Sequence, residues 1–550
     1  MTAMNVTETI ASILKSEGVE WMACFPSNPL IEAVAKEGIR PISFRHERGA
    51  VMAADGFSRM NDRQKFGVVA VQDQAGAENA MGGISQAFAD NVPILVLPRG
   101  SGLERTAVRP YFSAFKTYEP ISKHAEVITR PDMVGAVMRR AFHALRNGRP
   151  GPVVVEMPAD VCDQQVPEDA TPYHSPGVYV QSPSPSDVKD AVGALLDAAR
   201  PVIWAGMGVL LGGATAELRE FAELTEIPVY TTMPGKSGFD ERHPLALGGG
   251  SGSTTRAARQ WLQESDTLFA IGSSMTRTGY GQPIPPGKTI IHSVGSIEDI
   301  NKDFPVDIAL PGDAKATLQA MIDEVKSRLG EHGRRGETSA PSQIASVRED
   351  WLNAWMPVLT DDEEPINPYR VIWELNQNLD LENSVVTHDA GSPRDMMVPF
   401  FTATAPHTYI GWGKSTHLGY GIPLMIGVKM AYPDRFCLNF MGDAAFGMSG
   451  LDIETAARTG VAITTLVLNN GGMATYPGGF PTARLQYGVS HMYGDYAKIA
   501  EGMGAVGITV VKPSELGPAI MRARELNAEG KTVLLDVHTK FEDRRSPRDL

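Results

Sequence analysis

The chain is short of cysteine, of long apolar runs and of positive charge. Its three cysteines, Cys24, Cys162 and Cys437, lie far apart and form no CxxC pair, which argues against a zinc site and against a disulfide framework. The formal net charge is −14 and no basic block occurs. Nucleic acid or an anionic membrane surface is therefore not expected as the main partner.

No uninterrupted apolar run reaches about 18 residues, so we expect no membrane span. The N-terminal stretch MTAMNVTETIASILKSEGVEW carries acidic and polar residues where a signal peptide needs an apolar core. Together with the cysteine pattern, this predicts a soluble, cytoplasmic protein.

Short apolar runs alternate with segments of helical period along most of the sequence. In the first 160 residues the runs are WMACF, PISFR, FGVVAVQ, PILVLP and GPVVVEMP. This rhythm is typical of parallel α/β folds. A Pro/Ser-rich stretch (171–187) and a polar stretch (329–343) interrupt it. We therefore predict three α/β domains, each with a central parallel sheet flanked by helices, at 1–172, 187–335 and 366–550.

Polar residues follow two predicted strands of the third domain. Strand 436–441 ends at Gly442-Asp443, a helix is expected roughly over 449–459, and strand 461–468 ends at Asn469-Asn470. Because a β-α-β crossover returns to a parallel strand and is almost always right-handed, Asp443 and Asn470 are expected at the same carboxyl edge of one sheet.

An Asp carboxylate and an Asn carbonyl oxygen are hard ligands suited to Mg²⁺, which fills its remaining positions with phosphate oxygens and water. The small residues Ala444 and Ala445 leave backbone N–H groups open to a phosphate. The predicted ligand is a metal diphosphate. The alternative is that Asp443 only caps a helix and that Asn469-Asn470 forms a turn.

The pair Gly442-Asp443-Ala444 and Asn469-Asn470 resembles the GDG/GDA…NN signature of thiamin diphosphate (ThDP) enzymes. The surrounding order is similar to the acetolactate synthase, pyruvate oxidase and oxalyl-CoA decarboxylase superfamily. The resemblance implies a pyrimidine-binding domain, a Rossmann-like central domain and a pyrophosphate-binding domain. It further implies Mg²⁺ ligands at Asp443, Asn470 and the Gly472 backbone oxygen, and cofactor contacts at Gly391, Ser392, Gly442, Ala444, Ala445 and Met473.

The segment FRHERGAVMAADGF matches the catalytic glutamate motif of that family. Glu47 follows a predicted strand and starts a helix, at the edge where α/β ligand sites gather. The resemblance implies that Glu47 bonds N1′ of the aminopyrimidine ring, so that N4′ can remove the proton from thiazolium C2, after which the ring acts as an electron sink. Taken alone, Glu47 reads as a surface residue that stabilises the helix dipole.

The segment GKSTHLGYGIPLMIG resembles the family's wedge region, which bends the cofactor. The resemblance implies that Leu418 props the thiazolium and that the Thr416 backbone oxygen accepts the 4′-amino hydrogen. Leu418 can also be read as one core residue of an apolar helix, and His417 as a pocket residue or as a structural histidine. In the family, Glu47 and Asp443 of one site belong to different subunits, which implies a homodimer or homotetramer with active sites at the interface.

Substrate-facing segments depart from acetolactate synthases. Their Gly-Pro-Gly-Ala-Thr-Asn turn is QAGAEN here (74–79), their Gly-Gly loop is Ser27-Asn28, and their Phe-Gln-Glu is replaced by a segment with Arg109, Tyr111 and Phe112. These departures argue against a biosynthetic acetolactate synthase. We predict that the following residues line the substrate pocket: Ser27, Asn28, Gln74, Tyr111, Phe112, Arg277, Met473, Tyr476 and His417.

The central domain has GxGxxxG in PVIWAGMGVLLGG, a weak dinucleotide-binding signal. Val294 and Ser296 stand where relatives that hold FAD or ADP usually have Asp-x-Asp, and Ser274 stands for an arginine, with Arg277 close by. FAD or CoA/ADP binding therefore stays open. The Arg-rich tail KFEDRRSPRDL is read as a disordered end, or alternatively as a lid.

The sequence thus predicts a ThDP- and Mg²⁺-dependent lyase or transferase that makes or breaks a C–C bond next to a carbonyl. The leading version is an acetolactate synthase-like decarboxylase and carboligase acting on a 2-oxo acid. One alternative is a 2-hydroxyacyl-CoA lyase or oxalyl-CoA decarboxylase type enzyme, and another is a non-catalytic ThDP-binding homologue.

Overall fold

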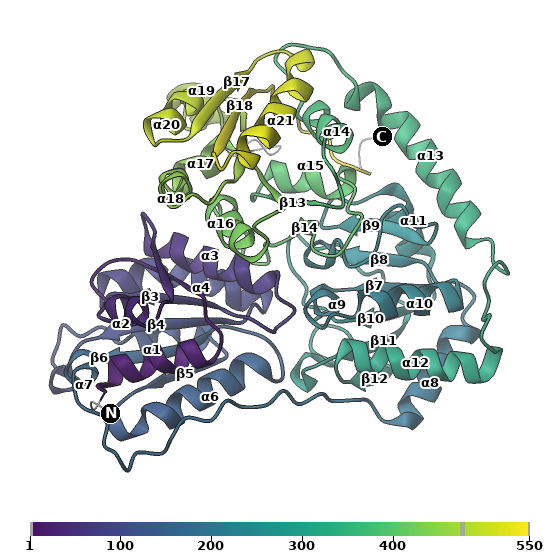
Figure 1. The fold of residues 1–550 in the computed structure, drawn as a ribbon. Coiled ribbons are helices and arrows are strands. Elements are labelled where there is room, and N and C mark those ends of the chain that lie inside the picture. Colours follow the sequence, from purple (N-terminus) through teal and green to yellow (C-terminus); the bar gives the residue numbers. More distant parts are fainter. Residues whose placement is uncertain (1–3, 474–478, 548–550) are drawn as a thin grey trace. The chain divides into compact units, whose positions relative to one another are not determined.

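The computed structural model describes residues 4–473 and 479–547, which contain three six-stranded sheets (Figure 1). All pairs of neighbouring strands are parallel. The first and third sheets have equivalent strand orders, β2-β1-β3-β4-β6-β5 and β14-β13-β15-β16-β18-β17. The central sheet, β9-β8-β7-β10-β11-β12, has the 3-2-1-4-5-6 order of a Rossmann fold. The predicted fold class is confirmed, whereas the exact domain boundaries stay a prediction.

The first sheet consists of β1 (Trp21–Cys24), β2 (Arg40–Ser43), β3 (Gly67–Val71), β4 (Ile94–Gly100), β5 (His124–Val127) and β6 (Val153–Pro158). Its helices are α1 (Val6–Ser16), α2 (Leu30–Lys36), α3 (Glu47–Arg59), α4 (Ala75–Asp90), α5 (Ala114–Tyr118), α6 (Val134–Arg146) and α7 (Ala159–Cys162). Every residue of β3 and β6 is buried, because helices cover both faces of a parallel sheet.

The central sheet consists of β7 (Pro201–Ala205), β8 (Val229–Thr232), β9 (Ala246–Gly250), β10 (Thr267–Ile271), β11 (Thr289–Val294) and β12 (Ile308–Pro311). Its helices are α8 (Pro185–Asp197), α9 (Met207–Leu211), α10 (Thr215–Thr225), α11 (Arg256–Glu264) and α12 (Ala314–Leu329). The long helix α13 (Ala340–Leu359) follows, in a stretch that the sequence assigned to no domain. Trp351 and Trp355 anchor it by packing against Phe400.

The third sheet consists of β13 (Ser384–His388), β14 (Tyr409–Ile410), β15 (Phe436–Gly442), β16 (Thr464–Asn469), β17 (Val506–Val510) and β18 (Val533–His538). Its helices are α14 (Pro368–Asn378), α15 (Ser392–Phe400), α16 (Gly421–Ala431), α17 (Asp443–Ser449), α18 (Asp452–Thr459), α19 (Pro481–Tyr487), α20 (Tyr496–Gly502) and α21 (Pro513–Ala528).

The single helix expected over 449–459 is two helices, and the first begins at Asp443 itself. An acidic residue in the first turn and the helix formers Ala444 and Ala445 favour this earlier start. The expectation of a disordered C-terminal end is also wrong for residues 540–547, because Ser546 is buried and hydrogen-bonded to Trp351.

The chain forms two compact units. One comprises Met1–Tyr179, Ser415–Asp434 and Ser449–Val461, and the other comprises Val180–Lys414, Arg435–Met448 and Ala462–Leu550. Helices α16 and α18 therefore belong to the unit of the first sheet, although the sequence places them in the third domain.

Helices α3 and α16 pack closely within the first unit. A Cβ on Gly56 would collide with the Leu424 carbonyl, and one on Gly427 would collide with the Ala53 carbonyl. These two close approaches show that the helices run antiparallel. The start of α16 therefore lies near the last turns of α3. Glu47, the first residue of α3, is nine positions before Gly56, roughly 14 Å along the helix.

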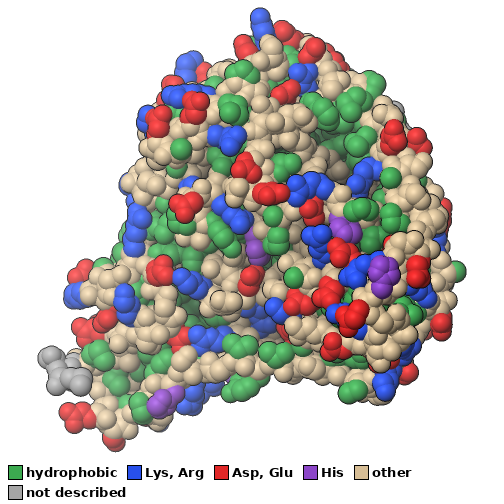
Figure 2. All heavy atoms as spheres, turned by 45° about the vertical axis from the view of Figure 1, so that its right-hand side comes forward, with side chains coloured by type: hydrophobic (Ala, Val, Ile, Leu, Met, Phe, Trp, Pro, Cys, Tyr) green, Lys and Arg blue, Asp and Glu red, His purple; other side chains and the backbone are tan. Residues whose placement is uncertain are grey.

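None of the three cysteines forms a disulfide bond, and all three are buried. Among the described residues, no helix combines the length and apolar character that crossing a lipid bilayer requires. On the face shown in Figure 2, Lys and Arg side chains are interspersed with Asp and Glu side chains.

Candidate functional site

Asp443 and the Asn470 loop meet at the carboxyl edge of the third sheet. Strands β15 and β16 are parallel neighbours in which Gly442 is paired with Leu468. Asp443 is 2% exposed. Its Oδ2 accepts the Gly471 N–H at 2.9 Å and its Oδ1 accepts the Ala444 N–H at 2.8 Å. The crossover thus brings together the two segments as the spacing predicts.

The chemistry of this edge suits a hard divalent cation. Burial raises the pKa of Asp443, and the surrounding backbone N–H groups oppose this by favouring the ionised form. The Asn470 Oδ1 accepts the Gly472 N–H at 3.1 Å, so the amide is held in the same loop. Among the described residues, no group of three or more His, Cys, Asp or Glu side chains could hold a metal. The set predicted here needs no such group, because it combines one carboxylate with an amide and a backbone oxygen.

Gly391 and Ser392 lie beside this edge. Strand β13 pairs with β15, and the Asp389 N–H donates to the Phe440 carbonyl at 2.8 Å. Gly391 has φ +88°, and Ser392 begins α15. The Pro393 ring is 3.8 Å from the position that a Cβ on Gly442 would take. Both segments predicted to contact a diphosphate are therefore adjacent.

Glu47 is buried at the start of α3, directly after β2. Only 2% of it is exposed, so the surface-residue alternative is wrong. The Asn79 amide donates to Glu47 Oε2 at 3.0 Å, and Oε1 lies 3.3 Å from the position of a Cβ on Gly76. Gly76 and Asn79 both come from the QAGAEN segment at the start of α4. This segment therefore shapes the surroundings of the glutamate.

A buried network in the same unit holds the segment 415–418. Gln86 Oε1 accepts the Ser415 hydroxyl at 2.6 Å and the His417 N–H at 3.3 Å. Gln86 Nε2 donates to Asp90 at 2.7 Å, and Asp90 pairs with Arg59 at 2.9 Å. Sequence reasoning missed Gln86, because nothing in the helix pattern distinguishes it from a solvated glutamine.

His417 and Leu418 precede α16 rather than lie within it. The His417 ring packs on Gly82, where a Cβ would collide with it, and its Nδ1 lies 3.1 Å from the Leu418 carbonyl oxygen. Burial lowers the pKa of His417, which keeps the imidazole neutral near pH 7. Thr416 has φ +53°, a left-handed conformation that is uncommon outside glycine. The turn at Thr416 directs its carbonyl differently from a helical residue.

Family models match the chain in three consecutive parts. The thiamine pyrophosphate enzyme N-terminal TPP binding domain matches residues 4–119, the central domain matches 188–321, and the C-terminal TPP binding domain matches 389–537. The chain belongs to the thiamin diphosphate enzyme family. It is therefore a ThDP-dependent enzyme, and the non-catalytic alternative is set aside.

Acetolactate synthases are among its similar relatives. A probable acetolactate synthase large subunit of Methanocaldococcus jannaschii is 30% identical over 97% of this chain and 92% of its own length. The acetolactate synthase large subunit of Corynebacterium glutamicum is 31% identical over 89% of this chain and 79% of its own. Isozyme 3 of Escherichia coli is 27% identical over 98% and 95%, respectively.

The glycine cluster of this ThDP enzyme's central domain serves packing. The Gly206 N–H donates to the Ile271 carbonyl at 2.9 Å, and the Gly208 N–H donates to the Gly272 carbonyl at 2.8 Å. A Cβ on either glycine would collide with the loop after β10. These two N–H groups are therefore engaged by the protein backbone, in the place where a dinucleotide site would present them to phosphate.

A chain of hydroxyl and ammonium groups lies close to that loop. Lys414 Nζ donates to Ser274 Oγ at 2.8 Å, and Ser274 Oγ is 3.0 Å from Thr276 Oγ1. Lys302 Nζ donates to Thr276 Oγ1 at 2.9 Å and also pairs with Asp299. The predicted candidate Arg277 is exposed, with its guanidinium 4.5 Å from the centre of the Phe304 ring. Sequence reasoning missed both lysines.

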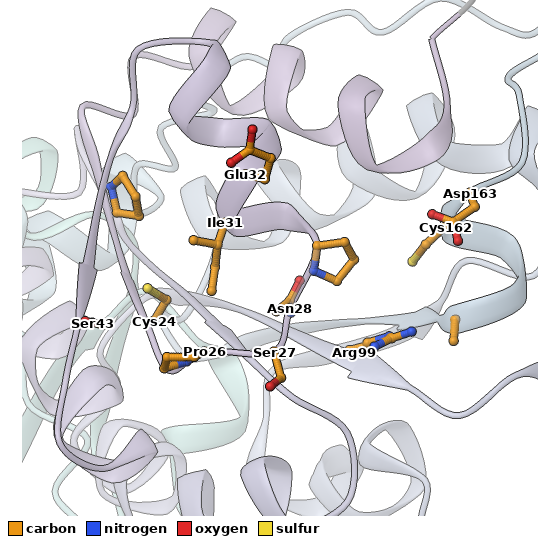
Figure 3. A pocket seen from close by; sticks show the side chains of 13 residues that line it. Cys24, Pro26, Ser27, Asn28, Ile31, Glu32, Ser43, Arg99, Cys162 and Asp163 are labelled. Carbon is orange, nitrogen blue, oxygen red and sulfur yellow. The ribbon is translucent and has the colours of Figure 1, made fainter.

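An open pocket of about 630 Å³ lies at the carboxyl edge of the first sheet (Figure 3). Ser27 and Asn28, two predicted substrate residues, line it together with Arg99 and Cys162. The Asn28 amide is tied to the Val71 and Leu97 carbonyls at 2.9 and 3.1 Å, so it fixes the loop between the strands.

Arg99 is the cation of this pocket and was missed by sequence reasoning. Among the described residues, its buried Nε has no hydrogen-bond partner. Figure 3 shows its side chain extended along the pocket toward Cys162 and Asp163. The signal in the sequence was an arginine at the end of an otherwise apolar, buried strand, where charged residues are rare unless they are paired.

The other predicted substrate residues differ in their exposure. Gln74 is exposed at the start of α4 with φ +46°, and Tyr111 and Phe112 are half-buried before α5. Met473 is exposed, whereas Tyr476 lies outside the described residues.

Proposed function

We propose that this ThDP enzyme uses Mg²⁺ to decarboxylate a 2-oxo acid and to join the resulting acyl unit to a second carbonyl compound, as acetolactate synthases do. The observation that carries the proposal is the pair of buried carboxylates at sheet edges, Glu47 beside Asn79 and Asp443 beside the Asn470 loop. When bound, ThDP supplies a ring that stabilises the carbanion formed by C–C cleavage.

Each predicted site residue would have its own role in binding or activating the cofactor. Asp443, Asn470 and the Gly472 backbone oxygen would hold Mg²⁺, and Gly391-Ser392 would contact the diphosphate. Glu47 would hold a proton at the pyrimidine N1′, and the Asn79 amide keeps its carboxylate in place at 3.0 Å. Leu418 and the Thr416 carbonyl would set the cofactor's bend. Burial of both carboxylates excludes water from their surroundings, which strengthens these interactions.

Arg99 supports a substrate that carries a carboxylate. A guanidinium presents paired N–H donors that match the two oxygens of a carboxylate, and this one lines an open pocket. Ser27 and Asn28 border the same pocket. A small 2-oxo acid fits this chemistry.

We further propose a homodimer or homotetramer in which Glu47 serves the cofactor held by the partner's third sheet. Glu47 lies at the end of α3 that is remote from the start of α16. Leu485, Tyr487 and Tyr493, which follow the Asn470 loop, are 87%, 80% and 93% exposed. Exposed apolar groups of this size suit an obligate interface. Three buried cysteines without a disulfide bond support a cytoplasmic location.

The proposal is tested by cofactor binding and product analysis. Calorimetry with ThDP is expected to show tight binding with Mg²⁺ and weak binding in EDTA, and a panel of 2-oxo acids should include at least one that releases CO₂. Glu47→Gln should abolish CO₂ release and retain ThDP binding. Wild-type protein that binds ThDP and Mg²⁺ but releases no CO₂ from any 2-oxo acid would refute the substrate class.

The acyl-CoA alternative rests on the group formed by Lys302, Lys414, Ser274 and Thr276. Two ammonium groups bound to neighbouring hydroxyls suit a phosphate of CoA or ADP. The double variant Lys302→Ala and Lys414→Ala should then raise KM for acyl-CoA substrates and leave KM for 2-oxo acids unchanged. Equal KM values for the double variant and wild type, and no CoA, ADP or FAD in native mass spectra, would remove this candidate.

A further inference from the structure

The C-terminal segment 540–547, which we call the tail, is held by partners from distant parts of the chain. The Ser546 hydroxyl accepts the Trp351 indole N–H at 2.8 Å and donates to the Thr254 carbonyl at 2.9 Å. The Thr254 N–H donates to the Ser546 carbonyl at 3.1 Å. The Tyr369 hydroxyl donates to the Arg544 carbonyl at 2.6 Å. The tail is therefore held against α13, α14 and the loop after β9.

Arg545 is directed from the tail onto Ser392. Its Nη1 donates to the carbonyl oxygens of Glu542 and Arg544 at 3.0 and 2.7 Å, and its Nη2 donates to Ser392 Oγ at 2.8 Å. The two backbone acceptors fix the plane of the guanidinium. Its other edge is therefore presented to Ser392, where α15 begins.

A second tail residue touches the Asn470 loop. A Cβ on Gly472 would collide with the Phe541 ring, so the ring packs directly on the backbone of that glycine. The tail thus contacts both segments that flank Gly442-Asp443, with Phe541 on the β16 side and Arg545 on the β13 side. A segment that contacts both sides of Gly442-Asp443 is placed to border a cofactor bound there.

A diphosphate bound at this edge would be stabilised by a nearby cationic side chain. A magnesium diphosphate beside the Asp443 carboxylate remains net negative, and Asp443 is buried. A guanidinium matches phosphate oxygens with parallel N–H donors, and such charge-assisted hydrogen bonds are about twice as strong as neutral ones. Ser392 and Arg545, already joined, can both donate to one phosphate.

We propose that Arg545 binds the diphosphate of ThDP together with Ser392, so that the tail is part of the cofactor site. This inference rests on the proposed function, because Ser392 faces a diphosphate only if ThDP occupies this edge. It assigns to the tail a role in holding the cofactor.

The test measures binding in the full-length protein without turnover. Dissociation constants for ThDP, and for inorganic pyrophosphate as a second probe, are measured with Mg²⁺ by calorimetry for wild type, Arg545→Met, Arg545→Lys and Arg544→Met. Arg544 is the matched control, because it lies in the same tail with the same charge but its side chain binds Glu542. Thermal melting of each variant without ligand reports whether the tail remains docked.

Arg545→Met is expected to weaken ThDP and pyrophosphate binding about 10- to 100-fold, the loss of one charge-assisted hydrogen bond. Arg545→Lys should restore part of the loss, and Arg544→Met should bind like wild type. Equal weakening by Arg544→Met, or unchanged binding by Arg545→Met, overturns the inference while the proposed function stands. Wild-type protein that binds neither probe overturns the proposed function itself.

Discussion

Gln86→Ala tests whether hydrogen bonds from Gln86 hold the segment 415–418 in position. Gln86 is fully buried and makes three hydrogen bonds, one to the Asp90 carboxylate and two from Ser415 and His417. Loss of the bond to the carboxylate costs about 1.5 to 3 kcal/mol, and loss of the backbone bond costs about 1 kcal/mol. Ser415 is exposed, so its hydroxyl regains water at little cost. We therefore expect about 3 kcal/mol of local destabilisation, before any cavity term.

The assay combines thermal melting with ThDP affinity. Gln86→Ala is expected to lower Tm by several degrees and to weaken ThDP binding about tenfold or more, because the loop that carries Thr416 loses two of its anchors. Gln260→Ala, an exposed glutamine bonded to Glu264 at 3.1 Å, serves as the control and should change neither quantity. Unchanged Tm together with unchanged ThDP affinity in Gln86→Ala would show that the network does not position the segment.

Gln86→Glu separates the two ends of the side chain. It retains an acceptor for Ser415 and His417, but it places a second carboxylate against Asp90 in a buried site where Arg59 already pairs with Asp55 and Asp90. Such a carboxyl has a raised pKa, so its folded form is favoured while it is protonated and loses stability as the pH rises. Melting relative to wild type should therefore be closer to normal at pH 5.5 than at pH 8.

Three further predictions concern other parts of the chain. Glu47→Gln keeps the shape of the contact with Asn79 but cannot share a proton, so CO₂ release should fall at least about 100-fold with ThDP affinity retained, and full activity would contradict the assigned role. Burial raises the pKa of Asp452 to about 6, so the folded state is more stable when this carboxyl is protonated. This contribution of about 3 kcal/mol is complete below the unfolded pKa near 4 and is lost as the pH rises through 6. Melting from pH 4.5 to 7.5 should show a wild-type decline relative to Asp452→Asn, and parallel curves would argue against it. Gly272→Ala, at φ +61° and against the Gly208 backbone, should lower Tm without altering ThDP affinity, and an unchanged Tm would exclude the packing role.

The fold was accessible from the sequence because its signals are local. Buried parallel strands are continuous apolar runs, and the polar residues that end them mark the carboxyl edge. Asp443 and Asn470 were found in this way, and their segments do meet. Helix starts were less accessible, since α17 begins at Asp443, directly after Gly442, the last residue of β15.

The surroundings of the site depended on contacts between distant segments. Gln86 meets residues 415–417 through a helix packing that no local pattern encodes, and the docking of the tail depends on Trp351 and Thr254, far away in sequence. The glycines after β7 resembled a nucleotide-binding signal, because the same residue type also permits two backbones to touch. Composition alone does not distinguish these two uses.

The first and third sheets have equivalent strand orders, so residues at their carboxyl edges can be compared position by position. Strand β15 corresponds in order to β3 and β16 to β4, so Asp443 and Asn470 take the places that Asp73 and Ser101 take in the first sheet. In the first sheet the Ser101 hydroxyl donates to Asp73 at 3.4 Å, just as the Gly471 N–H donates to Asp443 in the third sheet. Likewise β14 corresponds to β2, so Thr416 and Leu418 follow the strand that matches the one before Glu47. Because equivalent edges carry different residues, one edge can offer oxygen ligands to a metal while the other offers a proton-sharing carboxylate. The specificity of each edge therefore lies in its loop residues, and exchanging Asp443 for Asn should remove Mg²⁺ dependence of ThDP binding without disturbing the first sheet.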